Sequence, residues 1–114
     1  MIGEIKGSQG KRQLHVDFDS YTDNDPDFRK ELIDHMVENI RELISAHQIS
    51  AQQKDATLFL KVRHKVKTTL VMLDDKELDI LVDNVNGSVI NEPKGPSLEE
   101  LCTEIINSLL SERG

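Results

Sequence analysis

Apolar side chains recur every three or four residues along the first half of this 114-residue chain. An α-helix brings residues with this spacing onto one face, so the pattern predicts an amphipathic helix over about residues 25–47. An Asp/Asn cluster ahead of Pro26 indicates its start, with Asn24 or Asp25 as the cap. The predicted apolar face consists of Phe28, Leu32, Ile33, Met36, Val37, Ile40, Leu43 and Ile44.

The same spacing continues in the second half of the chain. It predicts a second helix over about residues 51–73, with Ser50 as its cap. Asp74 and Asp75 interrupt the pattern, and a third helix is expected over 76–86, before the helix stop at Asn86-Gly87.

A last helix is predicted after Ser97, which is expected to cap it. Its apolar face consists of Leu98, Leu101, Cys102, Ile105, Ile106, Leu109 and Leu110. Four amphipathic helices joined by short loops bury their apolar faces by packing together, so we predict an all-α, antiparallel up-down-up-down four-helix bundle. The alternating segment 14–18 is either a brief strand or a short extra N-terminal helix. Residues 1–12 are expected to be a flexible lead-in, and 13–114 the bundle domain.

Composition restricts the class of function. The chain is long enough for one domain and too short for two sizeable cores. Its formal net charge of −7 disfavours nucleic-acid binding, which needs a basic surface. We expect no signal peptide and no membrane insertion, because no apolar run has the required length and flanks. Cys102 is the single cysteine, so no internal disulfide can form, and we expect a cytoplasmic protein.

One short stretch is basic within this acidic chain. Lys61, Arg63, Lys65 and Lys67 surround His64. Such a charge run is often only a solvated face, but that reading does not explain why the cations gather here. The cluster suggests an acidic or phosphorylated partner at this position, and nearby cations favour a neutral, nucleophilic imidazole.

The helical period places His64 in the middle of the solvent face of the predicted helix 51–73, about two turns from either end. The opposite, core-facing side consists of Leu58, Phe59, Val62, Val66, Thr69, Leu70 and Leu73. The solvent side consists of Thr57, Leu60, Lys61, His64, Lys67, Thr68 and Val71. An incidental surface histidine is the plain alternative. However, Leu60 and Val71 are apolar residues on the exposed face, which indicates a surface for a partner.

The string from His64 to Leu73, followed by Leu78, resembles the signature of histidine-containing phosphotransfer (HPt) domains. In that signature an aliphatic residue follows the histidine at the second position, a lysine at the third and a leucine at the ninth, with another leucine five residues beyond. Val66 and Lys67 match the second and third positions, and the two leucines match the others.

The resemblance covers about residues 14–110, and the segment 21–44 is similar to the first long helix of the family and the acidic turn before it. Two residues depart from the pattern. Thr68 stands where the family usually has Gly or Ser, so we expect altered docking of the receiver or a narrower choice of partner. Asp74 stands where the family commonly has Gly at a turn, and aspartate adopts such a turn at a greater cost.

The resemblance implies a phosphate carrier of a two-component phosphorelay and not a stand-alone enzyme. His64 would be the phosphoacceptor, and Lys67 would stabilise the phosphorylated ring. The partners would be a response-regulator receiver domain and a sensor histidine kinase, bound by a monomer. Mg²⁺ would belong to the receiver, so no cofactor is expected in this chain. The docking surface would consist of Leu60, Lys61, Lys65, Thr68 and Val71.

Other kinds of site receive less support. The four histidines lack the spacing of a metal site, so no metal ligand is assigned. Cys102 lies on an apolar stripe and is predicted to be a buried packing thiol. Paired carboxylates such as Asp17 and Asp19 are explained as helix caps. The alternative function is a diverged helical interaction module, which binds a signalling partner through the Leu60 and Val71 face without phosphorylation.

Overall fold

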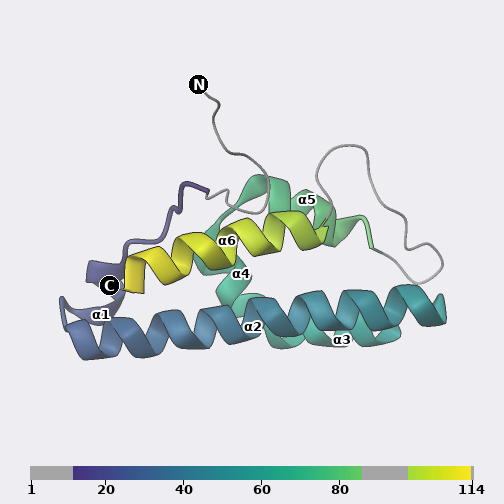
Figure 1. Ribbon diagram of the computed structural model, residues 1–114, viewed down its shortest axis with the longest axis horizontal. Coiled ribbons are helices and arrows are strands. Elements are labelled where there is room, and N and C mark those ends of the chain that lie inside the picture. The colour runs from purple at the N-terminus through teal and green to yellow at the C-terminus, as the bar shows by residue number, and fades with distance from the viewer. Residues whose placement is uncertain (1–11, 86–97, 114) are drawn as a thin grey trace, which may run out of the picture.

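The computed structural model describes residues 12–85 and 98–113, and over these ranges the chain is all-helical, as predicted (Figure 1). The helices are α1 (Phe18–Thr22), α2 (Pro26–Gln53), α3 (Thr57–Lys65), α4 (Lys67–Leu73), α5 (Lys76–Asp83) and α6 (Leu98–Arg113). Residues 14–17 of the alternating segment form neither of the two expected elements, and a short helix, α1, begins only at its last residue, Phe18. The predicted stop at Asn86-Gly87 and the predicted cap Ser97 lie outside the described residues.

The long helix α2 organises the packing. It contacts α1, α3 and α6, while α5 packs against α6. In Figure 1, α6 runs antiparallel to α2, and α3 folds back along α2 after a short connection. The buried apolar residues form one core, whose most deeply buried large members include Ile33, Met36, Ile40, Leu43, Phe59, Leu73, Leu78, Leu101, Ile105 and Leu109.

The start of α2 follows the sequence prediction. Asp25 is the N-cap, and its carboxylate accepts hydrogen bonds from the backbone N–H groups of Asp27 (2.9 Å) and Phe28 (3.2 Å). Pro26 occupies the first helical position, where a missing N–H costs nothing. The helix then continues past residue 47 to Gln53 and ends at Lys54, which has a left-handed backbone conformation with φ of 55°.

The sequence suggested that Ser50 caps the next helix from the position before it, but the structure shows otherwise. Ser50 lies inside α2 and is fully buried. Its hydroxyl accepts a hydrogen bond from the backbone N–H of Phe59 in the first turn of α3, at 3.1 Å. The N-cap residue of α3, Ala56, has no side-chain oxygen to do this. Ser50 therefore satisfies a free donor of α3 across the α2–α3 hairpin.

The predicted single helix over 51–73 is wrong, because Val66 separates α3 from α4. Its φ and ψ of −98° and 16° lie outside the regular α-helical region. The distortion is mild, since the Val66 N–H still bonds to the Val62 carbonyl at 2.9 Å and the Leu70 N–H bonds to the Val66 carbonyl at 3.2 Å. Consequently His64 lies in the last turn of α3, not two turns from a helix end.

The turn between α4 and α5 consists of two aspartates with different roles. Asp74 ends α4 in a left-handed conformation with φ of 47°. Asp75 is the N-cap of α5, and its carboxylate accepts a hydrogen bond from the Leu78 N–H at 3.1 Å. The turn therefore combines a positive-φ residue with a side-chain cap.

Arg12 joins this turn to α6, although the sequence analysis assigned Arg12 to a flexible lead-in. Its guanidinium binds both carboxylate oxygens of Asp75, at 2.8 and 3.2 Å. It also contacts Glu77 (2.6 Å) and Glu104 (3.5 Å). The backbone N–H and C=O of Arg12 both bond to the Ser108 hydroxyl at 2.7 Å. The other residues of the predicted lead-in, 1–11, lie outside the described part.

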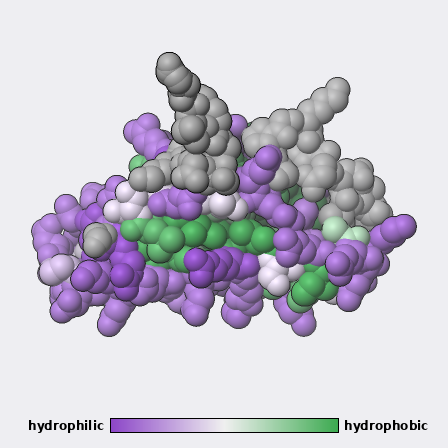
Figure 2. Space-filling view, viewed as in Figure 1, coloured by the Kyte–Doolittle hydropathy of each residue, from purple (hydrophilic) through white to green (hydrophobic). Residues whose placement is uncertain are grey.

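An apolar band follows the seam between α2 and α6 on the face drawn in Figure 2. Both helices also carry exposed apolar residues at their ends, including Ile49 on α2 and Leu110 on α6. No helix within residues 12–85 and 98–113 combines the length and apolar character needed to span a membrane.

Candidate functional site

The predicted core side of the segment around His64 is confirmed. Phe59, Val62, Val66, Thr69, Leu70 and Leu73 are buried, and Leu58 is half-buried. Phe59 and Val66 have no exposed surface. The helical period survives the distortion at Val66, because the α3–α4 junction keeps its hydrogen bonds of the helical i to i−4 type.

The predicted solvent side is also exposed, with one qualification. His64, Lys61, Lys67 and Thr68 are exposed, and 66% of the Val71 surface is accessible. Leu60, in contrast, is half-buried and packs against the core, so it offers only part of its surface.

Lys65 is also exposed, but its ammonium is engaged. Its Nζ lies 2.9 Å from Glu42 Oε2, so the charge is directed toward α2. Within residues 12–85 and 98–113, no hydrogen-bond or ion-pair partner is found for the His64 imidazole. The ring nitrogens of His64 are therefore accessible to an external group, while Lys65 is already paired.

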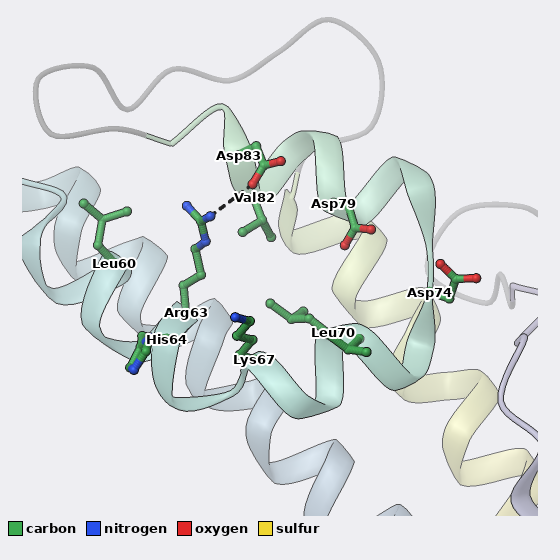
Figure 3. A pocket seen from close by; sticks show the side chains of 10 residues that line it. Leu60, Arg63, His64, Lys67, Leu70, Asp74, Asp79, Val82 and Asp83 are labelled. Atoms are coloured by element: carbon green, nitrogen blue, oxygen red, sulfur yellow. Dashed lines mark ion pairs between the residues drawn. The ribbon is translucent and has the colours of Figure 1, made fainter.

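A groove of about 600 Å³ lies between the α3–α4 segment and α5. It is lined by Leu60, Arg63, His64, Lys67, Leu70, Val71, Asp74, Asp79, Val82 and Asp83. Figure 3 shows the Arg63 side chain extending across the groove to Asp83, where Nη2 lies 3.3 Å from Oδ1. The imidazole of His64 points away from the acidic side chains of α5. One wall of this mixed-charge groove is thus basic, and the other is acidic.

The acidic wall is crowded. Burial raises the pKa of Asp79, and repulsion from Asp83, Asp74 and Asp75 raises it further. Sequence reasoning missed this wall, because Asp79 and Asp83 read as ordinary surface residues of a short helix. Their i, i+4 spacing on one helix face was the available signal.

A second groove, of about 480 Å³ and mainly apolar, lies where α1 and the start of α2 meet α4. It is lined by Tyr21, Phe28, Leu32, Lys67, Thr68, Val71 and Met72. Tyr21 is 53% exposed and Phe28 is 48% exposed. Sequence reasoning missed this apolar groove, because Phe28 falls on the same helical stripe as the buried Met36.

The two grooves share one edge. Lys67 and Val71 line both of them, and His64 lines the first. Thr68, which stands where a smaller residue was expected from the family pattern, forms part of the apolar groove. The accessible imidazole of His64 thus lies at the rim of the mixed-charge groove. Lys67, one helical turn away, lies on the edge that this groove shares with the apolar groove.

Other sequence candidates have structural roles. Cys102 is fully buried, and burial followed by repulsion from Glu99 raises its pKa to about 12. The prediction of a packing thiol is therefore confirmed. Asp17 caps α1 by accepting a hydrogen bond from the Ser20 N–H at 3.2 Å. His47 is buried with its ring edge against Phe59. In the described ranges, no three potential ligands come together in a group that could hold a metal ion.

Comparison with protein-family models, with curated proteins and with solved structures finds no match to this chain.

Proposed function

We propose that this chain is a histidine-containing phosphotransfer domain that accepts a phosphoryl group on His64 and passes it on. The observation that carries the proposal is the accessible, unpartnered imidazole of His64 with Lys67 one turn away. In this interpretation α2, α3–α4, α5 and α6 serve as the four helices of an antiparallel bundle, with α1 as an addition. Such a domain would work in the cytoplasm as a monomeric carrier.

The chemistry requires one nucleophilic nitrogen and good positioning. A ring nitrogen of neutral His64 would attack the phosphorus of an aspartyl phosphate on a receiver domain. The N–P bond forms, the P–O bond to the aspartate breaks, and the aspartate leaves as a carboxylate with the bonding electrons. The second ring nitrogen keeps its proton in the initial product. Transfer to the next receiver is the reverse of this step, and Mg²⁺ bound by the receiver would neutralise charge.

Lys67 supports this role through its charge and position. It is exposed one helical turn from His64, so its ammonium can approach phosphoryl oxygens without a change in the backbone. Lys61 is exposed on the other side of His64, one turn back. Together they would favour a phosphorylated and acidic partner over a basic one.

The apolar groove supports docking of the receiver next to His64. Tyr21, Phe28 and Val71 expose apolar surface there, and Lys67 adds a cation at its edge. Apolar surface with a charged rim is common at protein interfaces. The same groove would also serve a non-phosphorylated interaction module, so the groove alone does not separate the two functions. His64 and Lys67 favour the phosphate carrier.

The decisive experiment is phosphotransfer from a receiver. The protein is incubated with several receiver domains charged by acetyl phosphate, and labelled phosphate on this chain is tested for acid lability and base stability. We expect such a label on the wild type and none on His64→Gln. His35→Gln is the matched control, because His35 is an exposed histidine on α2 and should label like the wild type.

Lys67→Ala tests the assisting cation. It should slow transfer or shorten the life of the phosphohistidine about tenfold, the scale of one charge-assisted hydrogen bond, without a change in thermal stability. Lys30→Ala, at another exposed lysine, should have no effect. Absence of label with every receiver would leave the interaction module as the better explanation. A label that persists on His64→Gln would mean that another residue is the acceptor.

A further inference from the structure

The mixed-charge groove beside His64 holds a cation that the family resemblance does not use. Arg63 precedes His64 in the last turn of α3, and both residues line this groove. Its guanidinium is directed to α5, where Nη2 lies 3.3 Å from Asp83 Oδ1 (Figure 3). Thus a strong phosphate ligand lies next to the acceptor histidine but is bound to a carboxylate.

The contact between Arg63 and Asp83 is weak enough to be exchanged. The Arg63 side chain is 42% exposed and that of Asp83 is 67% exposed, and they share a single N–O contact. Exposed ion pairs contribute little to stability, because water screens the charges and holding both side chains costs entropy. A more strongly charged anion within reach can therefore take the guanidinium from Asp83.

A phosphoryl group on His64 would be such an anion. It carries a charge of about −1.5 to −2 near neutral pH, compared with −1 for the carboxylate. Its oxygens also match the planar fork of arginine, which can donate two parallel hydrogen bonds. Neighbouring residues of a helix do not face each other, but Arg63 and His64 line the same groove. Rotation of the long arginine side chain from Asp83 toward the His64 side of this groove would bring the guanidinium closer to a phosphoryl group on the ring.

We propose that Arg63 is a second phosphate-stabilising residue and that Asp83 controls its availability. Before phosphorylation the Arg63–Asp83 pair holds the guanidinium on the α5 side of the groove. After phosphorylation Arg63 leaves Asp83 and binds the phosphoryl oxygens, so the lifetime of the phosphohistidine depends on both residues. This inference rests on His64 as the phosphate carrier.

The test is a double-mutant cycle on the lifetime of phosphohistidine. The 114-residue chain is phosphorylated with phosphoramidate, the label is assigned to His64 by mass spectrometry, and its hydrolysis is followed by ³¹P NMR. Arg63→Gln should shorten the half-life about two- to fivefold, and Asp83→Asn should lengthen it by a similar factor, the scale of an exposed ion pair. Asp83→Asn should have no effect when Arg63 is already replaced.

Asp74→Asn is the matched control for charge. Asp74 lines the same groove, loses the same charge on substitution, and does not contact Arg63. Asparagine also tolerates the left-handed conformation at this position. A side-chain readout completes the test, because the Arg63 Nε–Hε resonance should shift on phosphorylation in the wild type. Arg63→Lys should restore part of the lost lifetime.

The outcomes separate the inference from the proposed function. Equal effects of Asp74→Asn and Asp83→Asn, or additive effects of the Arg63 and Asp83 substitutions, would overturn the inference while the labelled His64 stands. In contrast, suppose that no receiver labels the chain but the chemically formed phosphohistidine shows the expected cycle. The role of Arg63 is then supported, and the phosphorelay function is overturned.

Discussion

A single buried hydroxyl links the end of α2 to the start of α3. Ser50 Oγ accepts the Phe59 N–H, a donor that α3 cannot satisfy within itself. Ser50→Ala leaves this N–H buried without a partner, so the free energy of unfolding should fall by about 1–2 kcal/mol. Urea denaturation measures the change.

Ser45→Ala is the matched control, because Ser45 is an exposed residue of the same helix. Its effect should stay within about 0.5 kcal/mol. Equal effects at the two serines would mean that the hydrogen bond from the Phe59 N–H to the Ser50 hydroxyl contributes nothing to stability.

Asp74 is held in a conformation that suits glycine better. Its φ of 47° lies in the left-handed region, where a Cβ atom is unfavourable. Asp74→Gly should therefore raise the free energy of unfolding by about 0.5–1 kcal/mol. Relief of the left-handed conformation raises it by more than this, but glycine also makes the unfolded chain more flexible, which offsets part of the effect. The unfolding midpoint in urea measures this effect.

The same change in a regular helix should act in the opposite direction. Glu38 is an exposed residue in the middle of α2, and Glu38→Gly should lower stability by about 1 kcal/mol. A loss of stability in Asp74→Gly would show that the Asp74 side chain stabilises the turn more than its backbone conformation strains it.

At the scale of elements, periodicity predicted the existence and the buried faces of the helices well. It did so because one apolar face of each helix packs against the core, and burial follows spacing. The start of α2 was also predictable, because Asp25 and Pro26 act locally. The extension to Gln53 was missed, because Ser50 was interpreted as the cap of the next helix, although no Gly or Pro after residue 47 ends α2.

The α3–α4 distortion at Val66 had no signal in the sequence. Breaks in helices usually occur at Pro or Gly, and valine is neither. The exposure of His64 and Lys67 was predictable, because the helical period alone decides it. The acidic wall on α5 depends on how two helices pack, and no local pattern contains that information.

At the scale of the whole molecule, Arg12 holds together parts of the chain that are far apart in sequence. Its side chain is 20% exposed and that of Asp75 is 8% exposed, so this ion pair is screened less than a surface pair. Arg12→Gln should lower the free energy of unfolding at neutral pH by about 2 kcal/mol, because Asp75 loses a charged partner. Lys65→Gln, which breaks the exposed pair with Glu42, should cost less than about 1 kcal/mol.

The Arg12 contact also predicts a pH dependence. Burial opposes ionisation of Asp75, but hydrogen bonds from Arg12 and from the Leu78 N–H outweigh it and lower the pKa of Asp75. A carboxylate with a lowered folded-state pKa stabilises the protein fully above its unfolded value of 3.8. This stability is lost as the pH falls through the folded-state pKa.

The loss with acid should therefore be smaller in Arg12→Gln than in the wild type. Urea denaturation at several pH values between neutral and about pH 3 gives the free energy of unfolding, and its slope against pH measures this loss. Equal slopes in the two proteins would show that Asp75 is not stabilised through Arg12.

The bonds between the Arg12 backbone and the Ser108 hydroxyl have a consequence for how this fold can be connected to other chains. They place the point where the chain enters the bundle beside α6, the last described helix. A fold with its first and last segments side by side can be inserted into a loop of another protein without separating its own helices. It can also be circularly permuted. The contact between Arg12 and α6 would therefore keep these helices together if the fold were inserted into another protein.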